Sequence, residues 1–190
     1  MNKPAHIDEV VLQPGNFHFG DANTRIRTLL GSCVSITMWH PQKLIGGMCH
    51  YMLPSRSVKR ANLDGRYADE AMEMFMREIR RSGTHPSEYI VKAFGGGNMF
   101  PSIAKRCACQ DGRIGDACSS VSCKNAGIAK SIVAVHGFKM AVHDLGGTGH
   151  RNIAFDIWSG HVWVSHKRVQ AEKLVPLGGV FPESRLAYAG

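Results

Sequence analysis

Two strand-forming segments joined by a short turn constrain the fold of this chain more than any other feature. Residues 34–39 alternate in character and are rich in the side chains that favour strands. Residues 40–43 indicate a turn because proline stands at the second position. Residues 44–53 have the composition of a returning strand, which Pro54 ends. The segment is therefore predicted to form a β-hairpin.

The register of this hairpin is predicted to bring a cysteine and a histidine together. If the hairpin is symmetric about its turn, Trp39 faces Leu44, and counting outward from that pair places Cys33 opposite His50. Directly opposed side chains point to the same face of a sheet, with Cβ atoms about 4.5–5.5 Å apart. The same count turns Cys49 to the other face, where it is expected in the core. A one-residue slip would reverse these faces.

A cysteine beside a histidine is an arrangement suited to nucleophilic catalysis. A free thiol has a pKa of about 8.5, so it is mostly protonated at neutral pH, and a neighbouring imidazole can accept its proton. We therefore expect Cys33 to be the nucleophile and His50 its general base. Gly31 and Ser32 precede the cysteine, and their backbone N–H groups are candidates for binding an oxyanion. Thr28 is the candidate for the third group that orients the imidazole.

The same residue types also fit a structural role. A cysteine at the start of a strand is usually a small buried hydrophobe, and a histidine on a strand is usually a satisfied structural residue. From these residues alone, a cysteine-dependent hydrolase and a non-catalytic domain both stay open.

The rest of the chain predicts helices among further strands. Apolar residues recur at helical spacing between Asp64, the N-cap candidate, and Gly83, the stop signal; they are Met72, Phe75, Met76 and Ile79. A second helix is predicted over residues 117–135. Strands are predicted at residues 10–12, 89–94, 138–143, 152–156 and 162–165. No repeat or linker interrupts this order, so residues 1–190 are predicted to form one α+β domain, with residues 179–190 loosely ordered.

Composition limits the partners and the location of the protein. The formal net charge of +8 attracts acidic partners, but the basic clusters are not interleaved with aromatic residues, so no nucleic-acid binding is expected. No apolar stretch reaches the roughly 18 residues of a membrane helix, and the N-terminus lacks an apolar signal core. We therefore expect a cytoplasmic protein without direct membrane insertion, whose six cysteines are thiols.

Two motifs and a series of shorter ones resemble a known family. Residues 28–34 read Thr-Leu-Leu-Gly-Ser-Cys-Val, and residues 46–54 read Gly-Gly-Met-Cys-His-Tyr-Met-Leu-Pro. Both strings resemble signatures of the CheD family. Shorter motifs follow the family's order at residues 94–99, 114–115, 144–151 and 155–160. The resemblance covers the domain core, residues 10–168.

The resemblance to the CheD family implies a glutamine deamidase that acts on the cytoplasmic helices of chemotaxis receptors. Cys33 would form a thioester with release of ammonia, and water would then yield glutamate. Hydrolysis of glutamate methyl esters is implied as a further activity. His50 carries over as base and acid, whereas the family's threonine can lie one residue further from the cysteine than Thr28 does. The implied fold is a mixed β-sandwich of two sheets with helices packed on the outside, similar to toxin-type cysteine deamidases.

The resemblance implies no cofactor, and it suggests one protein partner besides the receptor. Some family members bind the CheC phosphatase, which competes with the receptor, so a CheC-type partner is a further expectation. A non-catalytic regulatory binding module of the chemotaxis pathway is the alternative from another class, and a general cysteine hydrolase or peptidase is a third reading.

In residues 106–130 the family usually carries a polar, Asn-containing helix start after Ile-Gly, whereas this chain has a cluster of cysteines. They are Cys107, Cys109, Cys118 and Cys123. Four cysteines so close together raise the hypothesis of a zinc site. Their spacing is not the paired C-x2-C pattern of structural zinc sites, so no metal is expected. We expect these cysteines to be buried or surface thiols instead.

Overall fold

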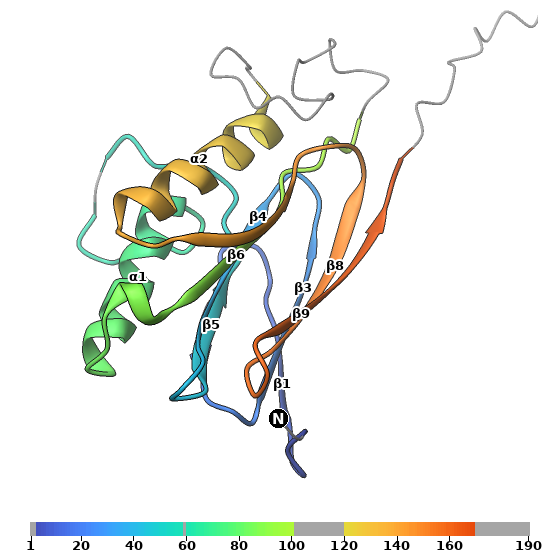
Figure 1. Ribbon diagram of the computed structural model, residues 1–190. Helices are drawn as coiled ribbons and strands as arrows, with labels where there is room; N and C mark the ends of the chain where they lie inside the picture. Colours follow the sequence, from blue (N-terminus) through green and yellow to red (C-terminus); the bar gives the residue numbers. More distant parts are fainter. Residues whose placement is uncertain (1–2, 59, 101–119, 170–190) are drawn as a thin grey trace, which may run out of the picture.

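The described part of the chain folds into two mixed β-sheets and two α-helices. The computed structural model describes residues 3–58, 60–100 and 120–169 (Figure 1). Its strands are β1 (Asp8–Val11), β2 (Phe17–Gly20), β3 (Thr24–Leu30), β4 (Val34–His40), β5 (Ile45–Cys49), β6 (Ile90–Gly95), β7 (Met140–Leu145), β8 (His150–Asp156) and β9 (His161–Lys167). Its helices are α1 (Ala68–Arg81), α2 (Val121–Val135) and the short 3-10 helix η1 (Pro86–Glu88).

The two sheets pack face to face, and the α-helices cover the outer face of one of them (Figure 1). One sheet has the strand order β1-β3-β8-β9, and the other has the order β2-β5-β4-β6-β7. Each sheet contains one parallel pair, β1 with β3 and β6 with β7, among antiparallel neighbours. Both α-helices pack against the five-stranded sheet. The predicted fold, an α+β domain built on a mixed β-sandwich with helices outside, is confirmed.

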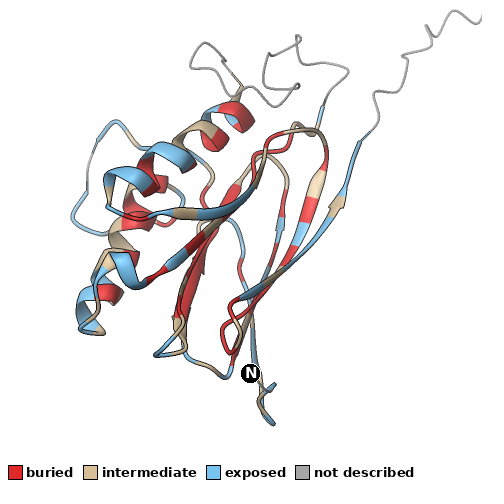
Figure 2. Ribbon diagram, viewed as in Figure 1, coloured by how far each residue is buried: buried red, intermediate tan, exposed pale blue. Residues whose placement is uncertain are grey.

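Buried residues lie along the strands of both sheets and on the α-helices (Figure 2), and they form two core clusters. The core under the helices includes Val34, Ile36, Met38, Met72, Phe75 and Ile79. The core between the sheets includes Ile26, Leu30, Met48, Phe94, Ile153 and Phe155. The five-stranded sheet contributes to both layers because successive side chains of a strand point to opposite faces.

Helix α1 follows its predicted apolar period, but its start differs from the prediction. The apolar stripe is buried, and Gly83 follows the C-cap with a φ of 61°, in the left-handed region that glycine tolerates. The N-cap is Tyr67 rather than Asp64, and no side chain makes the cap hydrogen bond. The Asp64 carboxylate instead accepts hydrogen bonds from the backbone and the guanidinium of Arg66. The prediction of this cap was wrong because a local ion pair competes for the carboxylate.

The other predicted elements are present, with boundaries that differ by a few residues. Strands β2 and β3 were not predicted, because their pairing with β5 and with β8 is not visible in the local sequence. Helix α2 begins at Val121, with the Ser120 side chain accepting a hydrogen bond from Cys123 N–H. Residues 117–119 of the predicted helix and the predicted tail at residues 179–190 lie outside the described residues.

Candidate functional site

The hairpin of β4 and β5 forms, but its register differs from the predicted one. Trp39 pairs with Gly46 rather than Leu44, and Leu44 lies in the turn with a φ of 51°. A bridge between Val34 and Tyr51 continues the same register toward the open end of the hairpin. Direct opposition of Cys33 and His50 was therefore a wrong prediction, because the loop begins one residue later than a symmetric turn would.

The change of register leaves the side chains on their predicted faces. Each partner shifts by two positions, and side chains alternate with a period of two. Cys33 packs against the core between the sheets, whereas Cys49 and Tyr51 belong to the core under the helices. His50 lies between those two residues in the chain, so its imidazole faces the other sheet. Cys33 and His50 thus share one face of the sheet as diagonal neighbours.

Thr28 of β3, in the facing sheet, lies within hydrogen-bonding distance of the His50 imidazole. Its Oγ1 lies 2.7 Å from His50 Nδ1, and it donates a hydrogen bond to the Leu12 carbonyl oxygen at 2.9 Å. A threonine hydroxyl has only one hydrogen. Because the carbonyl accepts that hydrogen, Thr28 Oγ1 accepts the Nδ1–H of the imidazole. Nε2 then carries the lone pair, and it is buried without a hydrogen-bond partner among the described residues.

Burial keeps the His50 imidazole neutral. The residue is 2% exposed, and burial lowers its pKa from 6.5 to about 4, against a smaller opposing effect of the Leu12 carbonyl. A charged imidazole is disfavoured in such surroundings because it loses its hydration. At neutral pH, His50 is therefore in the form that accepts a proton.

Cys33 is a free, half-buried thiol immediately before β4. Burial raises its pKa above the ordinary value, and a hydrogen bond with the Ser32 side chain acts in the opposite direction. The thiol therefore stays protonated at neutral pH unless a base accepts its proton. Cys49 is fully buried, and burial raises the pKa of its thiol to about 12, which makes it unreactive.

The turn that carries Cys33 is held by hydrogen bonds to three consecutive carbonyl groups. The oxygens of residues 31, 32 and 33 accept from Gly97 N–H, Asn125 Nδ2 and Gly96 N–H at 2.9, 3.0 and 2.7 Å, respectively. The C=O and N–H of a trans peptide point in opposite directions, so the Ser32 and Cys33 N–H groups point away from these donors. Neither group donates a hydrogen bond within the part of the chain that the structure describes.

Glycine allows β6 and the loop that follows it to approach this turn closely. Gly95 has a φ of 116°, and a Cβ at this position would overlap the Cys33 carbonyl oxygen. Gly95 O in turn accepts a hydrogen bond from the loop at residues 146–149 at 2.8 Å. The fully buried Arg151 donates to the Asp144 carboxylate at 2.8 and 2.9 Å beneath that loop. The glycine-rich segments therefore pack against the Cys33 turn on the side of its carbonyl groups.

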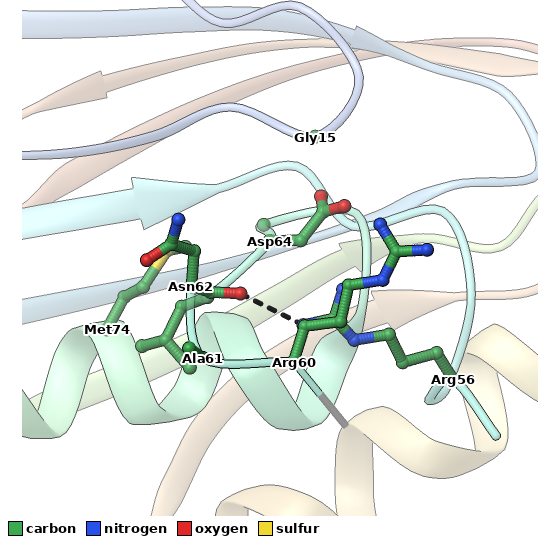
Figure 3. Close-up of a pocket in the computed structure, with 9 residues that line it drawn as sticks. Gly15, Arg56, Arg60, Ala61, Asn62, Asp64 and Met74 are labelled. Atoms are coloured by element: carbon green, nitrogen blue, oxygen red, sulfur yellow. Dashed lines mark hydrogen bonds between the residues drawn. The ribbon is translucent and has the colours of Figure 1, made fainter. Parts of the chain in front are cut away.

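Two pockets of about 510 Å³ each are formed by the described residues, and neither is lined by Cys33 or His50. The first is formed mainly by residues 60–65 with Gly15, Arg56 and Met74, and Figure 3 shows it in close-up. It adjoins the site through the backbone, because Gly15 N–H donates a hydrogen bond to the His50 carbonyl at 2.7 Å. The second lies between the strands β6, β7 and β9 and is lined mostly by apolar side chains.

The structure describes one of the four clustered cysteines. Cys107, Cys109 and Cys118 lie outside the described residues. Cys123 is buried on α2 and disulfide-bonded, so the expectation that all six cysteines are thiols is wrong for this one. Among residues 3–58, 60–100 and 120–169, no three His, Cys, Asp or Glu side chains are grouped so that they could hold a metal ion. Within the same ranges, no helix has the length and apolar character needed to span a membrane.

The fold and this Cys–His–Thr arrangement define an α+β domain with a candidate nucleophile at the start of a central strand. Residues 52–166 match the family model described as CheD chemotactic sensory transduction. The chain therefore belongs to the CheD family.

Several curated relatives are similar over nearly the whole chain. A Pseudomonas fluorescens protein named "Probable chemoreceptor glutamine deamidase CheD" is 48% identical, over 88% of this chain and 89% of that protein. A Pseudomonas savastanoi protein of the same name is 49% identical, over 90% and 92%. A Dechloromonas aromatica protein named "Probable chemoreceptor glutamine deamidase CheD 3" is 45% identical, over 85% of this chain and 89% of that protein. A solved structure, a Bacillus licheniformis hypothetical protein YfiH, is 10% identical with a TM-score of 0.39 over 67% of this chain and 49% of that chain, which is too low to carry an argument.

Asn125 is the residue near the candidate site that the sequence analysis did not single out. It lies on α2, is fully buried, and hydrogen-bonds the segment that carries Cys33. The other buried residues of the same helix are mostly small or apolar. An asparagine is unfavourable inside such a helix because its amide competes for backbone hydrogen bonds. That mismatch is a signal in the sequence that could have pointed to this residue.

Proposed function

We propose that this protein deamidates glutamine side chains in the cytoplasmic region of chemotaxis receptors, with Cys33 as nucleophile and His50 as general base and acid. Its membership of the CheD family and the names of its relatives support the assignment of receptor glutamine as the substrate. The observation that carries the mechanism is the Nε2 of a neutral His50, which has no hydrogen-bond partner in the described part of the chain and lies on the same face of the sheet as the Cys33 thiol.

The first half of the reaction forms a thioester. His50 Nε2 accepts the proton of the Cys33 thiol, and the thiolate attacks the carboxamide carbon of the glutamine. The Gly31–Ser32 and Ser32–Cys33 peptide groups bind the oxyanion through the N–H groups of Ser32 and Cys33. Collapse of the tetrahedral intermediate breaks the C–N bond, and His50 returns the proton so that ammonia leaves.

The second half hydrolyses the thioester. His50 accepts a proton from water, the hydroxide attacks the thioester carbon, and the C–S bond breaks. His50 returns its proton to the Cys33 sulfur, which regenerates the thiol, and the product carboxyl group ionises to glutamate. A glutamate methyl ester follows the same route with methanol as the leaving group. Thr28 holds Nδ1–H in both halves, so that Nε2 always faces the reacting atoms. No step needs a cofactor or a metal ion.

The proposed partner is the cytoplasmic part of a receptor, and the reaction takes place in the cytoplasm. The net charge of +8 favours encounter with an acidic protein surface. A CheC-type phosphatase would compete with the receptor for the face that carries Cys33. Addition of such a phosphatase is expected to raise the apparent KM for receptor without changing kcat.

Ammonia release and site-resolved mass spectrometry on receptor cytoplasmic fragments test this proposal. We expect glutamine-to-glutamate conversion by the wild type, none by Cys33→Ala, and retained conversion by Cys49→Ala. Cys49 is the matched control because it lies in the same hairpin with its side chain in the other core. A folded wild type that converts no glutamine in several receptors would instead favour a non-catalytic regulatory binding module. Conversion by the Cys33→Ala variant would refute the mechanism.

A further inference from the structure

The side chain of Asn125 links the two segments that carry Cys33 and His50. Its Nδ2 donates one hydrogen bond to the Ser32 carbonyl at 3.0 Å and another to the Met52 carbonyl at 2.7 Å. Ser32 directly precedes Cys33, and Met52 follows His50 by two residues. Both acceptors are carbonyl oxygens, which only the NH2 group of the amide can bind, so the orientation of the amide is determined.

The hydrogen bond to Ser32 sets the direction of a peptide group at the centre of the candidate site. While the Ser32 carbonyl points at Asn125, the Cys33 N–H of the same peptide points to the opposite side. A donor on the carbonyl also polarises the peptide and strengthens its N–H as a donor. Asn125 thereby prepares one of the two N–H groups that would bind the oxyanion, without itself contacting the substrate.

The burial of the Asn125 side chain is only partly compensated by hydrogen bonds within the described part of the chain. The residue is fully buried, and its Oδ1 has no hydrogen-bond partner among the described residues. Burying an unpaired carbonyl oxygen is unfavourable for folding. The helix is anchored to the sheet by a separate contact, in which the Tyr51 hydroxyl donates to the Asn125 backbone oxygen at 2.6 Å.

We propose that Asn125 is a positioning residue, which braces the Cys33 turn against the strand of His50 and directs the Cys33 N–H toward the oxyanion. This inference rests on the proposed function, because it treats Cys33 as the nucleophile and His50 as its base.

The test compares Asn125→Ala and Asn125→Asp with the matched control Tyr51→Phe. Aspartate keeps the shape of the side chain but removes the NH2 donors, and Tyr51→Phe removes the other anchor of the same helix turn. We expect kcat for glutamine deamidation to fall about a hundredfold in both Asn125 variants, with little change in KM, because misplacement by about 1 Å has an effect of that size. Tyr51→Phe is expected to keep kcat within about threefold of the wild type, since the NH2 contacts remain.

A second readout does not depend on the substrate. The rate of Cys33 alkylation by iodoacetamide, followed by site-resolved mass spectrometry from pH 5 to 9, is expected to fall about tenfold at pH 7 in the Asn125 variants, because His50 no longer reaches the thiol reliably. If the wild type deamidates no receptor while alkylation still depends on Asn125, the proposed function fails and this inference stands.

Three outcomes would overturn the inference. The first is a folded Asn125 variant whose kcat and alkylation rate both match those of the wild type. The second is an equal loss in Tyr51→Phe, which would show that the residue only docks the helix. The third is unfolding of both Asn125 variants by circular dichroism, which would assign the residue to the fold instead.

Discussion

Replacing Thr28 by valine tests how the His50 imidazole is held. Valine keeps the branched shape of the side chain but removes the hydroxyl. Two buried hydrogen bonds are lost, the one with His50 Nδ1 at 2.7 Å and the one to the Leu12 carbonyl at 2.9 Å. A buried hydrogen bond contributes about 1 kcal/mol net, so Thr28→Val is expected to lower the free energy of unfolding by about 2 kcal/mol. The Leu12 carbonyl already raises the pKa of His50, so it can accept the Nδ1–H in place of Thr28. This alternative acceptor limits the loss of stability.

The effect of Thr28→Val on catalysis follows from the freedom that the imidazole gains. Without the hydroxyl, the ring can rotate and the proton can move to Nε2, so that His50 is often unable to accept the thiol proton. A loss of about 1.4 kcal/mol in transition-state stabilisation corresponds to a tenfold fall in kcat. We therefore expect kcat to fall about tenfold, with a small change in KM.

Urea denaturation and ammonia release measure the two effects of Thr28→Val. Thr28→Ser is the matched control, because serine keeps the hydroxyl and is expected to keep kcat within about threefold of the wild type. A folded Thr28→Val protein with unchanged kcat would refute the assignment of Thr28 to the site. An unchanged kcat together with the expected loss of stability would leave Thr28 a purely structural residue.

Three further expectations follow from the same structure. The pKa of His50 falls from 6.5 to about 4 on folding, so the unfolded chain binds a proton that the folded protein does not; stability should decrease by about 3 kcal/mol as the pH falls from 6.5 toward 4. Urea melts at both pH values would show it, and an equal decrease in His50→Gln would contradict it. Gly95→Ala should lower stability by more than about 2 kcal/mol and abolish ammonia release, because it combines a positive φ with a clash against the Cys33 carbonyl; Gly137→Ala, at a φ of 79° with open space, should lower it by only about 1 kcal/mol. Equal losses in these two variants, measured by thermal melts, would show that no such clash exists. Asp144→Asn should lower stability by about 2 kcal/mol in urea melts, because it leaves the buried Arg151 charge without its carboxylate partner; a stability equal to the wild type would show that the pair contributes nothing.

The sequence was sufficient for features that depend on local patterns. The alternation of residues 34–39 and the turn after them predicted the hairpin, and the apolar period of α1 predicted its buried face. The faces of Cys33 and Cys49 were also predictable, even with the wrong register. Facing depends only on whether a residue number is odd or even along a strand, and a shift by two positions preserves it.

Contacts between residues far apart in the chain could be decided only by the tertiary structure. The register of β4 and β5 depends on the left-handed Leu44, a conformation that a β-turn pattern does not reveal. The hydrogen bond between Thr28 and His50 forms only because the two sheets pack face to face. Asn125 reaches Ser32 from a helix 93 positions away in the sequence. Periodicity determines which side of an element is buried, whereas packing determines which side chains meet there, because that depends on the positions of whole sheets and helices rather than on any local sequence signal.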